Sequence, residues 1–389
     1  MKPLIPYGKQ SISDDDIQVV VDILKSDWLT QGPVIDQFEN ACANYCGAEY
    51  AIAVNSATSA LHLACMAMDL GPGDILWTTP ITFVASSNCA LYCGAKVDFV
   101  DIDKKTYNLC PQLLEQKLIA AKKTNSLPKV LVAVHFAGQS CEMKPIRKLA
   151  DEYGFKIIED ASHAIGGKYE DQTIGSCQYS DLAIFSFHPV KIITTGEGGM
   201  VVTNNENLGT RIRLLRSHGV TRDEKLMLGQ TQGAWYYQQV ALGYNYRLTD
   251  IQAGLGLSQL RRIDTFVSQR HFLAAQYDEA LKNLPVVTPW QSPHCYSAYH
   301  LYPIQLKLES ITLSRKQVFD ELRQAGIGVN VHYIPVHTQP YYEKFGFKSG
   351  DFPIAEAYYE RAISLPLFYS MSIEEQDYVV ATLQSFLSR

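Results

Sequence analysis

Between residues 50 and 203 the chain alternates short apolar runs with segments of helical spacing. A run such as 130–134, Val-Leu-Val-Ala-Val, is apolar at every position, which is typical of a strand buried on both faces of a parallel sheet. Strands that alternate with helices predict an α/β fold, with a mostly parallel sheet covered on both faces. The expected strands are 50–54, 74–78, 96–100, 129–134, 155–159, 182–187 and 199–203, and the helices between them are 60–68, 82–93, 111–121 and 143–153.

The two ends of the chain differ from this central region. Before it, helices are expected over 14–26, with Ser13 as N-cap, and over 34–45. After residue 250 we expect one long helix, then a smaller α+β arrangement. We therefore predict a large domain over 1–250, which includes the N-terminal segment, and a small C-terminal domain over 251–389. The later elements are expected at 250–266 (helix), 300–306 (strand), 314–325 (helix), 328–333 (strand) and 373–387 (helix).

The composition excludes several classes of function. The chain has 389 residues, 47% of them hydrophobic, and a net charge of −6, which argues against a nucleic-acid-binding surface. No apolar run is long enough to span a membrane and no signal peptide is recognisable, so we expect a cytoplasmic protein without membrane contact. The nine cysteines are scattered without paired Cys-x-x-Cys sets, which predicts reduced thiols and no metal site.

Polar side chains follow four of the expected strands. They lie in the segments 55–59, 79–83, 135–138 and 160–163. In parallel sheets ligands bind beyond the carboxyl ends of the strands. The sequence therefore predicts a binding site at this edge of the sheet.

The most informative pair of residues is Lys191 and Asp160. Lys191 comes after the strand 182–187 and before the Gly/Thr-rich stretch 194–199, and Asp160 ends an earlier buried strand. Burial and nearby positive charge lower the pKa of such a lysine and make its amine nucleophilic. An aspartate in that position can keep a pyridine nitrogen protonated. The two residues form the minimal set of an enzyme that uses pyridoxal 5′-phosphate (PLP).

Other residues near this pair have both functional and ordinary interpretations. His163 could contact the cofactor, although a single histidine is more often structural. Thr58 and Ser59 begin a helix and could form an anion cradle or simply cap the helix. Phe83 could stack on a planar ring or belong to the core.

Two further residues could reach a phosphate group. Ser186 could donate a hydrogen bond to it, and Asn245 could do so across a subunit boundary, although the segment around Asn245 also reads as a turn. No GxxxxGK or GxGxxG motif is present at the expected positions, which argues against an ATP-type P-loop and a dinucleotide site.

Together these motifs make the chain similar to a known family. It resembles the DegT/DnrJ/EryC1/StrS sugar-nucleotide aminotransferases, which have the fold of aspartate aminotransferase (fold type I of PLP enzymes), a large domain with a mostly parallel sheet plus a smaller C-terminal α+β domain. The resemblance covers essentially the whole chain. Its motifs are 29–32 (LTQG), 55–61 (NSATSAL), 79–83 (TPITF), 159–163 (EDASH), 185–191 (FSFHPVK), 195–199 (TGEGG), 216–219 (RSHG), 245–247 (NYR) and 331–335 (VHYIP).

The resemblance implies roles for individual residues. Lys191 would bind PLP covalently and move a proton, Asp160 would pair with the ring nitrogen, His163 would contact the ring hydroxyl, and Phe83 would stack on the ring. Such enzymes are homodimers with two shared active sites and no metal. The cofactor phosphate would be held at Ala57, Thr58, Ser59 and Ser186 and by Asn245 of the partner subunit. The sugar nucleotide would contact Tyr7, Asp27, Trp28, Leu29, Thr30, Val331, His332, Tyr333 and Ile334.

Within the family, the segments 162–163, 186–188 and 331–333 are most similar to members that aminate C4 of a sugar in pseudaminic acid biosynthesis. Pro189 departs from the small residue expected there. The resemblance implies L-glutamate as amino donor and UDP-2-acetamido-2,6-dideoxy-β-L-arabino-hex-4-ulose, a UDP-4-keto-6-deoxy-N-acetylhexosamine, as acceptor.

Three alternatives remain open at this point. The acceptor could be a UDP-4-ketopentose or a dTDP-4-keto-6-deoxyhexose. The chain could be a PLP- or PMP-dependent sugar dehydratase, but in those enzymes histidine usually replaces the lysine. It could also be a non-catalytic binding protein, against which the complete set of Asp160, Lys191 and 195–199 argues.

Overall fold

The computed structural model describes residues 4–387. Its centre is a seven-stranded sheet in the order β1-β9-β8-β5-β4-β2-β3. Strands β3, β2, β4, β5 and β8 pair in parallel, and β9 runs antiparallel to both of its neighbours, so the prediction of a mostly parallel sheet is confirmed. The bounds are β1 Tyr50–Val54, β2 Ile75–Thr78, β3 Lys96–Phe99, β4 Val130–Val134, β5 Lys156–Asp160, β8 Leu182–Ser186 and β9 Gly199–Thr203.

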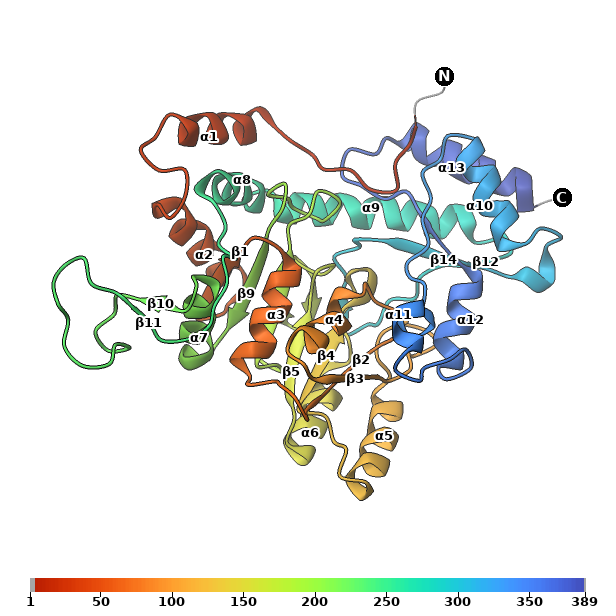
Figure 1. Cartoon of the computed structure of the whole chain (residues 1–389). Helices are drawn as coiled ribbons and strands as arrows, with labels where there is room; N and C mark the ends of the chain where they lie inside the picture. The colour runs from red at the N-terminus through yellow and green to blue at the C-terminus, as the bar shows by residue number, and fades with distance from the viewer. Residues whose placement is uncertain (1–3, 388–389) are drawn as a thin grey trace.

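Helices cover both faces of this sheet, as Figure 1 shows. Successive residues of a strand point to opposite faces. In β1, Ile52 and Val54 belong to the core under α3, α4 and α7, and Ala51 and Ala53 belong to the core on the side of α2 and α8. The helices are α2 Pro33–Cys46, α3 Ala57–Ala67, α4 Ala85–Tyr92, α5 Pro111–Lys123, α6 Met143–Tyr153, α7 Glu206–Arg216 and α8 Asp250–Leu260.

The C-terminal part has a hydrophobic core of its own, formed around Tyr277, Tyr302, Leu322 and Leu383. A three-stranded antiparallel sheet in the order β12-β14-β15 lies against helices in this region. This arrangement agrees with the expected α+β character, whereas the division of the chain at residue 250 remains a prediction. The bounds are α9 Ile263–Leu281, β12 Val286–Val287, β14 Tyr302–Leu306, α10 Arg315–Gln324, α11 Pro340–Glu343, α12 Pro353–Arg361, β15 Ala362–Leu365 and α13 Ile373–Leu387.

Five short strands and the first helix lie outside these two sheets. The strand β6 Lys168–Tyr169 pairs with both β7 Gln172–Thr173 and β13 Cys295–Tyr296, and β10 Val220–Thr221 pairs with β11 Gln238–Gln239. The predicted cap of α1 Asp14–Leu24 is confirmed, because the Ser13 side chain accepts a hydrogen bond from the Asp16 backbone N–H. None of the helices in the described part of the chain is long and apolar enough to cross a bilayer.

Three predicted elements are wrong in their extent. The helix expected over 250–266 is two helices, α8 and α9, with the break at Arg262, whose guanidinium pairs with the buried carboxylate of Asp16 in α1. The strand expected over 328–333 forms only one isolated bridge, at Asn330. The helix expected from residue 82 begins only at Ala85. In each case a tertiary contact or a turn interrupts or shortens an element that the local sequence pattern allowed.

Candidate active site

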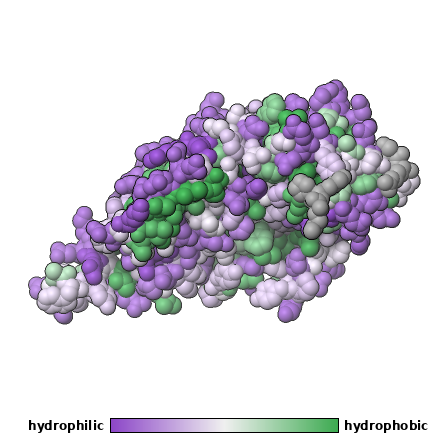
Figure 2. Space-filling model, turned by 90° about the horizontal axis from the view of Figure 1, so that it is seen from above, coloured by the Kyte–Doolittle hydropathy of each residue, from purple (hydrophilic) through white to green (hydrophobic). Residues whose placement is uncertain are grey.

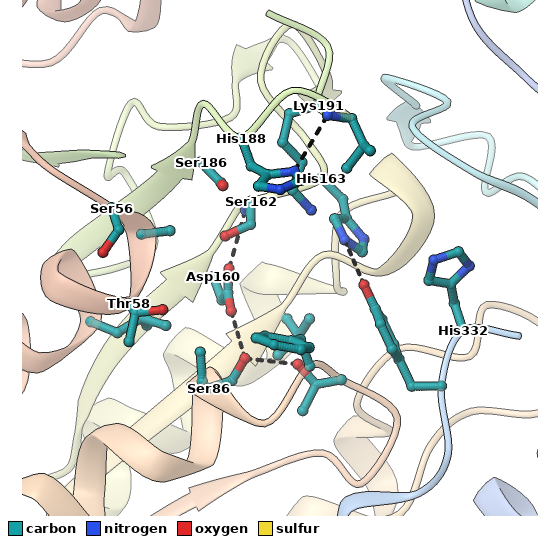
Figure 3. Close-up of a pocket in the computed structure, with 18 of the residues that line it drawn as sticks. Ser56, Thr58, Ser86, Asp160, Ser162, His163, Ser186, His188, Lys191 and His332 are labelled. Carbon is teal, nitrogen blue, oxygen red and sulfur yellow. Dashed lines mark hydrogen bonds between the residues drawn. The ribbon is translucent and has the colours of Figure 1, made fainter. Parts of the chain in front are cut away.

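A cavity of about 530 Å³ lies at the carboxyl ends of the sheet strands. Asp160 is the last residue of β5, Ser186 is the last residue of β8, and Lys191 follows β8 by five residues. The first turn of α3 forms another wall. The predicted site residues that line the cavity are Tyr7, Ala57, Thr58, Phe83, Asp160, His163, Ser186, Lys191, Val331, His332 and Tyr333, and Figure 3 shows most of them.

The carboxylate of Asp160 is buried and held in one orientation. Its Oδ2 accepts a hydrogen bond from the Ser86 hydroxyl at 2.6 Å, and its Oδ1 accepts one from the Ser162 backbone N–H at 3.1 Å. The Ser86 hydroxyl is in turn 2.7 Å from that of Thr82 (Figure 3). A carboxylate fixed by two donors can face a protonated ring nitrogen without losing rotamer freedom on binding.

Lys191 enters the cavity from the turn that follows β8. Its backbone N–H donates to the His188 carbonyl at 2.9 Å, and among the described residues its ammonium forms no ion pair. Burial lowers the pKa of Lys191 to about 8, although the negative charge of Asp160 acts in the opposite direction. This amine is therefore neutral, and hence nucleophilic, far more often near neutral pH than an ordinary lysine is.

His163 lies close to two further aromatic residues. Its Nε2 is 3.1 Å from the Tyr333 hydroxyl, and its ring centroid is 4.4 Å from that of His300. Burial, together with the positive charge of Lys191, holds the pKa of His163 well below its usual range, so the imidazole is neutral. Its Nδ1 is buried and has no hydrogen-bond partner among the described residues. An unpartnered buried nitrogen is costly, and a polar group bound in the cavity could satisfy it.

The start of α3 forms an anion cradle. Ser56 is the N-cap and accepts a hydrogen bond from the Ser59 backbone N–H at 3.1 Å. The N–H groups of the first turn have no carbonyl partner within the helix, and they attract anions. Gly199 of β9 passes directly beside this turn, since a Cβ at residue 199 would lie 2.6 Å from the Ala57 nitrogen. Only glycine allows that approach, which explains one glycine of the 195–199 motif.

The cavity therefore fits a phosphorylated pyridine such as PLP. The α3 cradle and Ser186 would hold the phosphate, Asp160 would pair with the ring nitrogen, and the free Nδ1 of His163 could bond a ring hydroxyl. Lys191 provides an amine in the same cavity. Phe83 lines the cavity and is 60% exposed. It is therefore available for ring stacking and is not packed in the hydrophobic core.

Several predicted site residues do not line this cavity. Ser59 directs its hydroxyl to Asn55 Oδ1 at 2.6 Å. Asn245 pairs through its backbone with Ser217 and lies beside Asn55, outside the cavity lining. The segment 27–30 lies outside the cavity, with Trp28 and Leu29 exposed, and so does the exposed Ile334.

The structure also adds residues that the sequence did not individually assign to the site. Ser86 is the most important of them, because it holds Asp160. A serine in the first turn of the helix after segment 79–83 is the signal that could have indicated it. Others that line the cavity are Ser56, Thr82, Ser162, His188, Val190, Glu197 and Asn330.

With this geometry established, comparisons with known proteins identify the family. The model of the DegT/DnrJ/EryC1/StrS aminotransferase family matches residues 10–384. The chain belongs to this family. The match covers Asp160 and Lys191, both of which line the cavity.

Individual relatives agree over their full lengths. The chain is 39% identical to the UDP-4-amino-4,6-dideoxy-N-acetyl-beta-L-altrosamine transaminase of Campylobacter jejuni over 389 residues, which covers 99% of this chain and 98% of the relative. The structure of Helicobacter pylori PseC, an aminotransferase involved in the biosynthesis of pseudoaminic acid, is 31% identical with a TM-score of 0.89 and covers 99% of both chains. The putative sugar aminotransferase Spr1654 of Streptococcus pneumoniae in its PMP form is 29% identical with a TM-score of 0.90 and covers 99% of both chains.

These comparisons confirm three predictions. The fold is that of the family, the chain is a sugar aminotransferase, and its cofactor is PLP, since Spr1654 has been solved with PLP as well as with PMP. The roles of the individual residues rest on the geometry described above.

The hydrogen bond from Ser86 to Asp160 generates a first prediction. Ser86→Ala should lower turnover roughly tenfold or more, because a hydrogen bond to a charged group contributes about 1.5–3 kcal/mol. Ser87→Ala is the matched control, since the Ser87 hydroxyl bonds the Val84 carbonyl and the Tyr342 hydroxyl instead of the site. The measurement is the steady-state turnover of both variants. Equal losses of turnover in Ser86→Ala and Ser87→Ala would contradict the role of Ser86.

The lowered pKa of Lys191 generates a second prediction. The rate at which apoenzyme binds PLP covalently should rise with pH and level off above about pH 8, because the neutral amine predominates above its pKa. In Asp160→Asn the midpoint should move to lower pH, since the carboxylate raises the lysine pKa. The measurement is the pH dependence of the appearance of the cofactor absorption band. A midpoint near that of an ordinary lysine would contradict the effect of burial.

Proposed function

We propose that the chain transfers the amino group of L-glutamate to C4 of UDP-2-acetamido-2,6-dideoxy-β-L-arabino-hex-4-ulose, as a step of pseudaminic acid biosynthesis. The observation that carries this proposal is the end-to-end similarity to a relative named as the corresponding transaminase, combined with a cavity that holds a complete set of catalytic groups. The amino donor, the sugar and the pathway are all parts of the proposal.

In this proposal each residue of the cavity has a defined task. When bound, PLP would supply the site with a carrier for the amino group between the donor and the keto carbon of the sugar. Asp160 keeps the proton on the ring nitrogen, and the donors Ser86 and Ser162 hold the carboxylate in position. Lys191 moves a proton at the reacting carbon, which its lowered pKa favours. His163 is neutral and bonds the ring hydroxyl.

The rest of the cavity would bind the substrate. Tyr7 and the segment 331–333 line the cavity and would contact the sugar. The exposed residues Asp27, Trp28, Leu29, Thr30 and Ile334 lie outside the cavity and would contact the nucleotide where it leaves the cavity. Ala57, Thr58 and Ser186 would hold the cofactor phosphate.

We also propose that two chains form a homodimer with shared active sites. Asn245 is outside its own cavity, so the phosphate contact expected of it needs Asn245 of the partner subunit. The arm that carries β10 and β11 projects from the body (Figure 1) and exposes Trp235. A hydrophobic strip is also visible in Figure 2, on the side where α1 exposes Ile17 and Leu24. Apolar surface of this kind is typical of an interface.

Light scattering tests the dimer directly. We expect a mass of twice the 43.5 kDa chain, and Asn245→Ala should weaken PLP binding although the residue does not line its own cavity. A single-chain mass for the active holoenzyme would contradict the shared site.

The alternatives differ in what the site would do. A dehydratase or a non-catalytic binder would not need the amine of Lys191 beside Asp160, and both residues are in the cavity. A different nucleotide sugar would be aminated by the same catalytic groups. The similarity to known relatives supports the type of reaction more strongly than the identity of the acceptor.

The deciding experiment tests the amino donor and the sugar acceptor in two separate steps. The PLP form is treated with L-glutamate, freed of excess donor, and mixed singly with a UDP-4-keto-6-deoxy-N-acetylhexosamine, a UDP-4-ketopentose or a dTDP-4-keto-6-deoxyhexose. We expect glutamate to remove the absorption band of lysine-bound PLP, and only the first sugar to restore it and gain an amino group by mass. Restoration by another sugar alone would contradict the proposed acceptor, and Lys191→Ala serves as the inactive control.

A further inference from the structure

The hydroxyl of Tyr333 joins two parts of the chain that are 170 residues apart. It is 3.1 Å from Nε2 of His163, as the dashed line at His163 in Figure 3 marks, and the two ring planes differ by only 22°. His163 follows the central strand β5, whereas Tyr333 comes from the C-terminal part of the chain. The sequence predicts a sugar contact for Tyr333, and nothing in the proposed reaction uses this hydrogen bond.

Contacts on several sides hold Tyr333 in place. Its ring packs against that of Phe83, with 6.4 Å between the centroids. The residue before it is fixed twice, because Nδ1 of His332 is 2.8 Å from the Ser364 hydroxyl and the Tyr358 hydroxyl donates to the His332 carbonyl at 2.9 Å. A side chain whose neighbours are fixed in this way can present its hydroxyl in one defined position.

His163 has only one N–H to donate. Burial, together with the positive charges of Lys191 and His332, holds the pKa of His163 well below its usual range, so the imidazole is neutral. The adjacent His300, whose ring centroid is 4.4 Å away, is neutral for the same reason of burial, which also holds its pKa low. A neutral imidazole carries its proton on one nitrogen, and the hydrogen bond at the other nitrogen determines which one.

The two possible tautomers leave different groups at Nδ1 of His163. This nitrogen is buried and has no hydrogen-bond partner among the described residues. If the Tyr333 hydroxyl donates to Nε2, the proton is on Nδ1, and Nδ1 is a donor. If Nε2 donates to Tyr333 instead, Nδ1 presents only a lone pair.

The chemistry of the cofactor distinguishes these two cases. In the proposed function Asp160 keeps the ring nitrogen of PLP protonated, and this positive charge makes the ring hydroxyl more acidic. The ring oxygen is then anionic and requires a hydrogen-bond donor. Only the tautomer with its proton on Nδ1 provides that donor at the unpartnered nitrogen of His163.

We propose that Tyr333 is a positioning residue, whose hydroxyl donates to Nε2 of His163 and thereby fixes the imidazole proton on Nδ1, from which His163 donates to the ring oxygen of PLP. The inference rests on the contact between His163 and the ring hydroxyl in the proposed function. It assigns to Tyr333 a task within the cofactor site, in addition to the sugar contact.

The test measures the pH midpoint at which the absorption band of lysine-bound PLP changes in the holoenzyme. This midpoint reports the loss of the proton that lies between the lysine nitrogen and the ring oxygen, and a donor to that oxygen stabilises the deprotonated form. Tyr333→Phe should therefore move the midpoint upwards, by roughly 0.4–1 pH unit if the lost bond is a neutral one.

Tyr358→Phe is the matched control. It removes a buried tyrosine hydroxyl that bonds the His332 carbonyl, so it loosens the same segment without touching His163. We expect a clearly smaller shift of the midpoint than in Tyr333→Phe. Equal shifts in the two variants would overturn the proposal, because they would show that loosening of the segment alone accounts for the effect.

A second arm uses His163→Asn. The amide nitrogen of asparagine is about as far from the backbone as Nδ1 of histidine, and it always carries protons, so no partner is needed to place them. We expect Tyr333→Phe to shift the midpoint in the wild-type background and to have little effect in the His163→Asn background. The same shift in both backgrounds would contradict the selection of a tautomer.

Failure of this inference and failure of the proposed contact give different results. His163→Leu removes both ring nitrogens, and an unchanged midpoint in that variant would contradict the contact between His163 and the ring oxygen. If His163→Leu shifts the midpoint upwards and Tyr333→Phe does not, the contact stands and the positioning role of Tyr333 is refuted. The unfolding temperature of each variant shows that it is folded.

Discussion

The burial of Lys191 opposite a fixed carboxylate is the interaction on which the site depends. A lysine in water carries a proton and cannot act as a nucleophile at neutral pH. Removal of Lys191 from water lowers its pKa to about 8, and Asp160 limits how far it falls. The cost of burying Asp160 is offset by hydrogen bonds from Ser86 and Ser162. The two groups thus have opposite charges and separate tasks within one cavity.

The sheet brings these groups together. Asp160 and Ser186 end adjacent parallel strands, β5 and β8, so their side chains reach the same edge. Gly199 lies opposite Ser186 in the next strand and has no side chain, which lets the backbone of β9 approach the start of α3. The phosphate cradle is therefore positioned by contact between main chains, which is stiffer than a contact through flexible side chains.

The central region of the fold could be predicted from the sequence because its strands are short, largely apolar runs, such as Val130–Val134, between segments of helical spacing. Where the prediction failed, a distant contact decided the outcome. The break between α8 and α9 accompanies the pairing of Arg262 with Asp16, which are separated by 246 residues. The segment 328–333 is extended like a strand but pairs at a single residue, and a Cβ at Gly328 would lie 2.8 Å from the Ile5 carbonyl oxygen. Local periodicity contains no information about such approaches.

The candidate site was predictable in a similar way. Asp160 ends a strand, and His163 and Lys191 follow strand ends. In a parallel sheet these ends lie at the same edge, so the three side chains reach the same site. Ser86 was not predicted, since a serine in the first turn of a helix has an ordinary capping explanation until the carboxylate beside it is seen. Asn245 could not be placed in a site by the fold of one chain. Its expected role depends on a second copy.

The most direct test of the central claim identifies the lysine that binds the cofactor. The holoenzyme is reduced with borohydride, which makes the bond between lysine and PLP permanent, and is then digested and sequenced by mass spectrometry. The account predicts that the peptide containing Lys191 carries the reduced cofactor and that other lysine peptides do not. Cofactor found on a different lysine, or on none, would contradict the assignment of Lys191 and the arrangement built around it.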